Sequence, residues 1–464
     1  MSEFEIRSPY DGALVGRVHE HTPAEVDEAV VGAVRAVETT RKMAGYERQE
    51  ILWRVSRAIA EQAEAFAQLM VREAGKPVRA ARAEVERAEF TFRVAAEESV
   101  RMGGEVLPLD WQASTKGNWS MIRRFPVGVV LAITPFNFPL NLVAHKLAPA
   151  MAVGCTVVLK PAPQTALTAR KLAEIVYEAG WPRDALAVLH VANERVGELV
   201  RDERMQMLSF TGSAAVGWEL KAKAGKKKVA LELGGNAGVI VHADGDVELA
   251  AQRCVAGAFT YAGQSCISVQ RIFVHEAVEE RFTRRLRELA AGLKVGDPGR
   301  ADTDVGPMIR ASDVDRVESW IDEAKREGAK ELLGEGAGRR TPESASVIRP
   351  SILTDTRAEM KVNAEEIFAP VCTVEAYREL REAIASINSS RYGLQTGIFT
   401  HDMRAVMEAF ENLQVGGVVL NDVPTFRIDH MPYGGVKDSG LGREGVRWAM
   451  EEMTEPRALI VRGL

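Results

Sequence analysis

Residues 128–160 read GVVLAITPFNFPLNLVAHKLAPAMAVGCTVVLK, and this stretch decides the fold. Two short runs of apolar residues, Gly128–Ile133 and Thr156–Lys160, enclose a segment with a helical pattern. Short apolar strands that alternate with helices are typical of a parallel sheet with helices on both faces. The alternation continues in the runs Ala187–Val191, Met207–Phe210 and Val229–Leu233. We therefore expect a doubly wound α/β sheet.

A second series of strands and helices begins near Ala237. Its candidate strands are Val239–Val241, Gln270–Val274, Val347–Leu353, Val371–Tyr377, Gly397–Thr400 and Gly417–Asn421. The 464 residues also exceed what one core supports, because cores stop growing at about 250–300 residues. The sequence thus predicts two doubly wound, Rossmann-like α/β domains.

The first hundred residues are mostly helical. Thr22 to Glu25 form a capping box with proline at the first helical position, so a helix begins near Thr22. Further helical patterns cover about 48–71 and about 78–102. The segment Asp110–Arg124 and the tail Pro456–Val461 are strand-like but lie outside both alternations. We assign them to a small projecting β ribbon and an edge strand suited to contacts between copies of the chain.

The composition excludes several classes of protein. Apolar residues make up 46% of the chain and charged residues 27%, which is typical of a folded globular protein. A net charge of −6 provides no basic field for nucleic acid or an anionic membrane, so we expect neither partner. The four cysteines form no CxxC pair, so we expect no metal site and no disulfide framework. The N-terminus lacks the apolar segment of a secretory signal, and we expect a cytoplasmic protein.

Ligands of open parallel sheets bind beyond the carboxyl ends of the strands, so motifs directly after a strand are candidates for function. Phe210-Thr211-Gly212-Ser213-Ala214-Ala215-Val216-Gly217 follows one strand and opens a helix. Its glycines permit close backbone approach, and free amides there can meet a phosphate. The alternative is a simple turn, because the spacing is not GxGxxG. Lys160 would place a cation on the same edge of the sheet.

Three polar residues stand where chemistry is possible. Cys266 is the one cysteine flanked by small polar residues, although such a thiol is often only structural. Glu232 interrupts the apolar strand before Gly234, as a salt-bridged or a functional carboxylate. Asn137 follows a strand and is either an oxyanion donor or a helix N-cap.

A cysteine nucleophile, an amide donor, a carboxylate base and a dinucleotide site together describe one reaction. With these residues the chain resembles the aldehyde dehydrogenase superfamily over essentially its whole length. The motifs that carry the resemblance are PFNFP at 135–139, KPA at 160–162, FTGS at 210–213, ELGGN at 232–236, GQSC at 263–266, EEIF at 365–368 and PYGGVK at 432–437.

The resemblance implies NAD(P)-dependent oxidation of a small-molecule aldehyde to the carboxylate, by the non-phosphorylating, hydrolytic route. Cys266 would attack the aldehyde carbon, and Asn137 with the Cys266 amide would hold the oxyanion. Glu232 would activate water to hydrolyse the thioester, with a pKa raised toward neutrality by burial. Lys146 matches a lysine next to the active site, without a specified role.

For the cofactor, the resemblance implies that Lys160 bonds the adenosine ribose and Ser213 the pyrophosphate. Glu366 would bond the nicotinamide ribose, with Phe368 near the nicotinamide. The other residues assigned to the cofactor site are Phe210, Thr211, Gly212 and Val216. Many NAD-preferring members have glutamate three residues after the lysine, where this chain has Pro163. We therefore expect NAD or NADP, with NADP favoured, because nothing at Pro163 repels a 2′-phosphate.

The substrate pocket is less defined. Phe138 and His145 project from the segment after Asn137, and Arg87 aligns approximately with a position that lines the aldehyde entrance in relatives. An arginine there favours a small polar or anionic aldehyde. The alternative for Arg87 is an exposed side chain on a charged helix, and the alternative for His145 is a packed histidine.

The domain assignment that follows is residues 1–105 and 125–234 for the dinucleotide and 235–440 for the nucleophilic cysteine. Residues 106–124 and 454–464 would form the contacts of a homodimer or homotetramer. Two rival functions remain. A coenzyme A-acylating semialdehyde dehydrogenase shares the fold and thiol but generally lacks the base corresponding to Glu232, and a non-catalytic protein can keep the fold.

Overall fold

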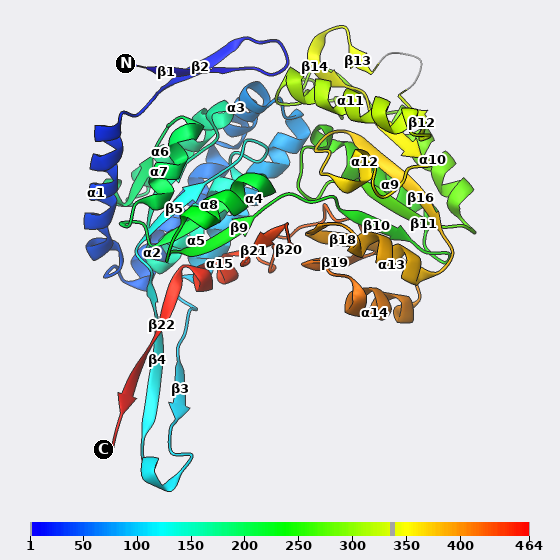
Figure 1. The fold of residues 1–464 in the computed structure, drawn as a ribbon. Coiled ribbons are helices and arrows are strands. Elements are labelled where there is room, and N and C mark those ends of the chain that lie inside the picture. The colour runs from blue at the N-terminus through cyan, green and yellow to red at the C-terminus, as the bar shows by residue number, and fades with distance from the viewer. Residues whose placement is uncertain (1, 335–338, 464) are drawn as a thin grey trace.

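The computed structural model describes residues 2–334 and 339–463. Figure 1 shows two α/β bodies side by side, with a long ribbon projecting from the first. Each body is built on its own mostly parallel sheet, so the fold class predicted from the sequence is confirmed.

The first sheet has six strands in the order β21-β9-β8-β5-β6-β7. Their bounds are β5 Val129–Ile133, β6 Thr156–Lys160, β7 Leu186–Val188, β8 Met207–Thr211, β9 Lys228–Glu232 and β21 Gly440–Leu441. The five strands β5 to β9 run parallel, and β21 joins β9 antiparallel from the far end of the chain.

Helices cover both faces of this sheet because its strands are apolar on both sides. Val130 and Ala132 of β5 pack in one core, and Val129 and Leu131 pack in the other. The first core is covered by α2 Gly45–Glu61, α3 Ala63–Ala74, α4 Val78–Glu98, α5 Asn141–Val153, α6 Ala166–Glu178 and α15 Val446–Glu452. The second is covered by α1 Pro23–Thr40, α7 Val196–Arg201 and α8 Ala214–Lys223.

The second sheet has seven strands in the order β12-β15-β16-β11-β10-β18-β19, parallel except for the β12 edge. Their bounds are β10 Gly238–Val241, β11 Arg271–His275, β12 Lys330–Leu333, β15 Ser351–Thr354, β16 Val371–Tyr377, β18 Gln395–Phe399 and β19 Gly417–Leu420. Its helices are α9 Val247–Phe259, α10 Glu279–Ala291 and α11 Ala311–Arg326 in one core, and α13 Leu380–Asn388 and α14 Met403–Asn412 in the other.

The ribbon is a three-stranded antiparallel sheet in the order β22-β4-β3. Its strands are β3 Glu105–Pro108, β4 Trp119–Pro126 and β22 Thr454–Val461. It leaves the first body and carries exposed apolar side chains, with Trp111 88% exposed. The remaining short elements are β1 Glu3–Arg7, β2 Leu14–His19, β13 Arg340–Thr341, β14 Ser344–Ile348, α12 Lys361–Ala364, β17 Tyr392–Gly393 and β20 Val436–Lys437.

The predicted element boundaries are wrong in three places. The segment Asp110–Arg124, expected to be strand-like, becomes a strand only at Trp119 and contains a 3-10 turn at Ala113–Thr115. The helix expected over about 48–71 is two helices, α2 and α3, because the chain leaves the helical conformation at Gln62. The strand expected over Val347–Leu353 is divided between β14 and β15, which belong to different sheets. Pro350 lies at this break and has no amide proton for a continuous ladder. The capping box at Thr22 is present as expected.

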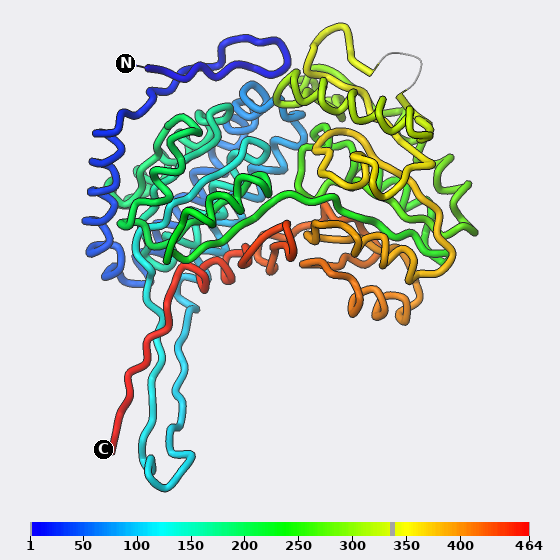
Figure 2. Tube along the Cα trace, viewed as in Figure 1, coloured from blue at the N-terminus to red at the C-terminus, as the bar shows by residue number. Residues whose placement is uncertain are grey.

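The chain passes between the two bodies twice, as Figure 2 shows along the Cα trace. The first crossing links β9 to β10, and the second returns from the second body through β20 and β21 to α15. Both crossings pass near the carboxyl ends of strands, where ligands of such sheets bind. Among residues 2–334 and 339–463, no helix has the length and apolar character of a membrane span, and no cluster of metal ligands occurs.

Candidate active site

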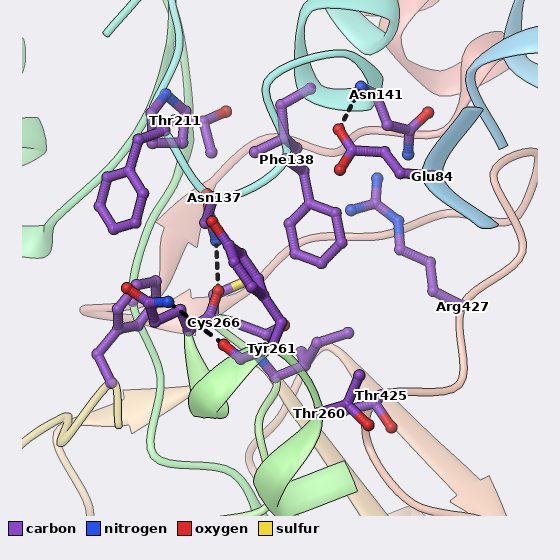
Figure 3. Close-up of a pocket in the computed structure, with 18 of the residues that line it drawn as sticks. Glu84, Asn137, Phe138, Asn141, Thr211, Thr260, Tyr261, Cys266, Thr425 and Arg427 are labelled. Atoms are coloured by element: carbon purple, nitrogen blue, oxygen red, sulfur yellow. Dashed lines mark hydrogen bonds between the residues drawn. The ribbon is translucent and has the colours of Figure 1, made fainter. Parts of the chain in front are cut away.

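A cavity of about 620 Å³ opens between the bodies and is lined from both. Figure 3 shows its lining residues, with Asn137 and Phe138 of the first body facing Cys266 and Arg427. The first body contributes the loop after β5, the turn after β8 and the end of β9, and the second contributes the loop before β11. The motifs that follow strands in the sequence therefore meet at one place.

The loop that carries Cys266 has an unusual backbone. Tyr261 and Ala262 have φ of 53°, a left-handed conformation that costs roughly 1–3 kcal/mol for each non-glycine residue. The fully buried side chain of Gln264 holds this loop, because its amide donates to the carbonyl oxygens of Tyr261 and Pro307 and accepts from the amide of Ile309. Cys266 follows these two residues in the same loop and lines the cavity.

Cys266 is the partly exposed cysteine, and Cys155, Cys254 and Cys372 are buried. Its sulfur lies 3.2 Å from the hydroxyl of Tyr433. Burial raises the pKa of Cys266 to about 11, while the Tyr433 hydrogen bond lowers it. Formation of the Cys266 thiolate therefore depends on the neighbouring groups that lower this pKa, Tyr433 and Arg427.

Asn137 follows β5 and has its side chain in the cavity wall. Its Nδ2 donates to the carbonyl oxygen of Gln264 at 3.0 Å, and the dashed line in Figure 3 marks this bond. An amide NH₂ has two protons, so one remains for a substrate oxygen. This geometry supports the donor interpretation, because the side chain is bonded to the Cys266 loop and not to the helix that follows.

Two buried charges hold the segment after Asn137, and the sequence analysis missed both. Glu84 of α4 accepts hydrogen bonds from the backbone amides of Leu140 and Asn141, at 2.9 and 3.1 Å. Lys76 pairs with Glu84, and its ammonium lies 3.8 Å from the ring centroid of Phe138. A charged residue on the buried face of an amphipathic helix was the available signal for Glu84.

Glu232 ends β9 and is 5% exposed. Its Oε2 has no hydrogen-bond partner in the described part of the chain. Burial, reinforced by the nearby Glu444 carboxylate, raises the pKa of Glu232 well above its ordinary value, as expected from the sequence. A carboxyl group without a partner beside the cavity is suited to proton transfer.

Glu444 is the ionised member of this pair of carboxyl groups. Its two oxygens lie 3.3 Å from the Lys146 ammonium and 3.0 Å from Nη2 of Arg427. Although burial opposes ionisation, Lys146 and other neighbouring cations lower the pKa of Glu444 to about 2. Lys146 lies outside the cavity lining and is fixed to Glu444, a carboxylate that lines the cavity.

Arg427 places a positive charge in the cavity wall, and no sequence motif pointed to it. Its side chain is 7% exposed, and its guanidinium lies 3.8 Å from the ring centroid of Tyr433. The Nε atom is buried and makes no hydrogen bond within residues 2–334 and 339–463, although the Asp429 carboxylate lies 4.0 Å away. A buried, partly unsatisfied cation beside a nucleophile can bind an anionic group.

The two charged candidates for substrate binding have different positions. Arg87 lines the cavity, but its guanidinium is held by Asp429 through two hydrogen bonds of 3.0 and 2.7 Å. His145 lies behind the cavity wall, with its Nε2 2.7 Å from Asp429, so the interpretation of His145 as a substrate ligand is corrected to a packed histidine. Phe138 lines the cavity as expected.

The turn after β8 has features of a phosphate site. Thr211, Gly212 and Ser213 line the cavity, and the buried Oγ1 of Thr211 has no partner in the described chain. Ser213 is the N-cap of α8, and its side chain makes no capping bond. A Cβ at Gly212 would lie 2.6 Å from Cζ of Phe210, so the Phe210 ring packs under the turn. Free helix amides and hydroxyls are the donors that a pyrophosphate requires.

Glu366 and Phe368 line the same cavity from the second body. Glu366 accepts from the backbone amide of Gly235 at 2.9 Å, and burial raises its pKa to about 7. Lys160 lies outside the cavity lining, at the end of β6, with its ammonium 2.5 Å from the side-chain oxygen of Asn193. Val216 is exposed on α8. The residues present fit an extended dinucleotide that runs from the edge of the first sheet into the cavity.

The comparisons with known proteins identify the family. The model of the aldehyde dehydrogenase family matches residues 1–459. The 3-sulfolactaldehyde dehydrogenase of Priestia megaterium is 43% identical over 460 residues, which cover 99% of this chain and 95% of that protein.

Two solved structures share the fold. Aldehyde dehydrogenase 21 from Physcomitrella patens, in complex with the reaction product succinate, has a TM-score of 0.96 and 43% identity, over 99% of this chain and 95% of that one. The glyceraldehyde-3-phosphate dehydrogenase of Methanocaldococcus jannaschii, complexed with NADP, has a TM-score of 0.94 and 39% identity, over 99% of both chains. The chain therefore belongs to the aldehyde dehydrogenase family and is an NAD(P)-dependent enzyme that oxidises an aldehyde.

Proposed function

We propose that this enzyme oxidises a small anionic aldehyde to the carboxylate through a thioester on Cys266, with water as the acyl acceptor. Arg427 carries the proposal, because its guanidinium lies in the cavity wall and its Nε makes no hydrogen bond within the described residues, with the Asp429 carboxylate at 4.0 Å. A carboxylate, sulfonate or phosphate on the substrate would pair with this guanidinium.

The charges around Arg427 favour an anion. Three cations, Arg87, Lys146 and Arg427, face two carboxylates, Asp429 and Glu444. Hydrogen bonds from His145 and Arg87 hold the pKa of Asp429 well below its usual range despite burial. Burial and the neighbouring Arg427 lower the pKa of His145, so its ring is neutral. The names of two relatives agree with this class, since one acts on 3-sulfolactaldehyde and another holds succinate as its product.

The reaction follows from the positions of three side chains. The Cys266 sulfur bonds to the aldehyde carbon, and the carbonyl electron pair moves to oxygen. The second N–H of the Asn137 side-chain amide donates a hydrogen bond to this oxygen. The oxidised nicotinamide dinucleotide, when bound, supplies the hydride acceptor. After hydride loss, Glu232 accepts a proton from water as the water attacks the thioester carbon and releases the Cys266 thiolate. The unpaired carboxyl group of Glu232 supports water over coenzyme A as the acceptor.

For the cofactor, we propose that residues 1–105 and 125–234 bind the dinucleotide and that NADP is favoured over NAD. Lys160 is held at the end of β6 by Asn193, and burial lowers its pKa to about 8. Pro163 places no carboxylate near this ammonium. The NADP bound by the Methanocaldococcus jannaschii relative agrees with this preference.

For the assembly, we propose that the ribbon and the C-terminal tail, residues 106–124 and 454–464, contact another copy of the chain in a homodimer or homotetramer. Leu459 and Ile460 of β22 are exposed large apolar residues on an extended edge strand. An exposed edge of this kind is either covered by a partner or prone to aggregation.

Arg427→Met tests the substrate class. Loss of a hydrogen bond to a charged group should lower kcat/KM for carboxylated and sulfonated three- or four-carbon aldehydes by about 10- to 150-fold. The kcat/KM for propanal should fall by a smaller factor, because Arg427 also pairs with Glu444 and lowers the pKa of Cys266. Arg253→Met is the matched control, because Arg253 also lines the cavity but both arms of its guanidinium bond Asp422. An equal loss for charged and uncharged aldehydes would show that Arg427 is only structural.

The pH dependence of turnover tests Glu232. Only the ionised carboxylate accepts a proton, and its pKa is raised, so turnover should rise with pH between about 5 and 8. Glu232→Gln should keep the first-turnover burst of reduced cofactor and lower later turnover about 10²- to 10⁴-fold in stopped-flow absorbance. Cys266→Ala should lose the burst as well. A flat profile in the wild type would contradict the role of Glu232.

Lys160→Met tests the cofactor preference. If Lys160 pairs with a 2′-phosphate, its loss should raise the Kd for NADP about tenfold or more while raising the Kd for NAD less. Quenching of tryptophan fluorescence measures both constants. Lys171→Met is the control, because this lysine of α6 bonds Gln62 away from the cavity. Equal changes for the two cofactors would refute the pairing.

A double substitution, Leu459→Lys with Ile460→Lys, tests the assembly. It should reduce the molar mass measured by light scattering after size exclusion, because it places two charges in the proposed contact. Val31→Lys, at an exposed apolar position on α1, should leave the mass unchanged. An unchanged assembly in the double variant would remove β22 from the interface.

A further inference from the structure

Tyr433 touches the nucleophile, yet no step of the proposed reaction uses it. Its hydroxyl lies 3.2 Å from the Cys266 sulfur, which is its hydrogen-bond partner within the described residues. The residue is 4% exposed and lines the same cavity. A buried phenol next to a reactive sulfur is a candidate for direct participation.

The ring is fixed in this position from several sides. The backbone amide of Tyr433 donates to the carbonyl oxygen of Glu444 at 3.0 Å, in an isolated antiparallel bridge. Ile267 and Leu394 pack against the ring in one apolar cluster, and the guanidinium of Arg427 covers its face. The hydroxyl can therefore move little without breaking these contacts.

The direction of the hydrogen bond follows from the chemistry of its two partners. Burial and the neighbouring Cys266 raise the pKa of the Tyr433 phenol well above its ordinary value, so the phenol keeps its proton and can donate it. A thiolate has no proton and accepts. The charged groups that face Cys266 act in both directions: Glu366 and Glu232 raise the pKa of the thiol, and Arg427 lowers it. The bond from Tyr433 is the largest influence that lowers this pKa.

We propose that Tyr433 is a catalytic residue that donates a hydrogen bond to the Cys266 sulfur, stabilises the thiolate and holds it toward the aldehyde carbon. The phenol keeps its proton throughout. During attack, a sulfur lone pair forms the carbon–sulfur bond and the hydrogen bond weakens. When water cleaves the thioester, the electrons of the carbon–sulfur bond return to sulfur. The Tyr433 hydroxyl then donates its hydrogen bond to the thiolate again. This proposal rests on the proposed role of Cys266 but on no particular substrate.

Tyr433→Phe removes the hydroxyl and keeps the ring. We expect the apparent pKa for alkylation of Cys266 by iodoacetamide to rise by about one to two pH units in the full-length enzyme. Mass spectrometry of the Cys266 peptide gives the alkylation rate between pH 6 and pH 11, and a pKa higher by about one to two pH units lowers this rate about 10- to 100-fold at each pH below the wild-type pKa. The buried Cys155, Cys254 and Cys372 should stay unmodified and so report an intact fold in every variant. In steady state, kcat for propanal should fall with a small change in KM.

Two further variants separate a direct role from general disturbance. Tyr392→Phe alters another buried tyrosine, in β17, which is not bonded to the sulfur, and it should leave the alkylation pKa unchanged. Incorporation of 3-fluorotyrosine at position 433 makes the phenol more acidic and a stronger donor, so it should lower the alkylation pKa.

An alkylation pKa that is the same in the wild type and in both variants at position 433 would overturn the proposal. Alkylation needs no aldehyde, so this result is independent of the proposed function. An enzyme that oxidised none of the aldehydes would contradict the function while the thiol measurement still tested Tyr433.

Discussion

The ion pair of Lys76 and Glu84 is the interaction on which the geometry of the cavity depends. Neither side chain is exposed, and Glu84 also accepts the first amides of α5, where the helix dipole favours a negative charge. Asn137 and Phe138 shortly precede this helix end, so the pair helps to place Asn137, the proposed oxyanion donor, near Cys266 (Figure 3). Removing either charge would leave the other buried without a partner, which costs far more than the pair gains. The segment of the first body that faces Cys266 is thus held by a buried ion pair.

A second constraint is that the cavity holds two buried carboxyl groups close together, Glu232 and Glu444. Glu444 has two cations within hydrogen-bond range and stays ionised, whereas one oxygen of Glu232 has no partner. Two neighbouring carboxyl groups cannot both ionise cheaply, so the cations on one side decide which keeps its proton. Lys146 and Arg427 therefore act on the pKa of Glu232 through Glu444, and Arg427 is also the residue proposed to bind the substrate anion.

The sequence was most informative where one physical rule dominates. Strands β5 to β9 were predictable because buried parallel strands need unbroken apolar runs, and Cys266, Asn137 and Glu232 were visible as polar exceptions next to them. The break at Pro350 was missed because the apolar run continues past it. Arg427, Asp429 and Tyr433 lie in a segment without periodicity. Asp429 and Tyr433 have partners far away in the sequence, since 284 residues separate Asp429 from His145 and 167 separate Tyr433 from Cys266. Arg87 and His145 were both candidates from the sequence. Only the fold shows that Asp429 forms an ion pair with Arg87 and lies within hydrogen-bond distance of the buried His145.

The second crossing of the chain has a consequence for synthesis on the ribosome. The first sheet receives β21, and its helical layer receives α15, only when residues beyond 440 have been made. An N-terminal domain usually folds while the rest of a protein is still being translated. Here the first body must wait for β21 and α15, with the surface that packs against α15 uncovered during translation of the second body. Chaperone binding to the nascent chain should therefore persist until residues through Glu452 have left the ribosome, and a chain stalled after the second body would lack part of the core of the first body.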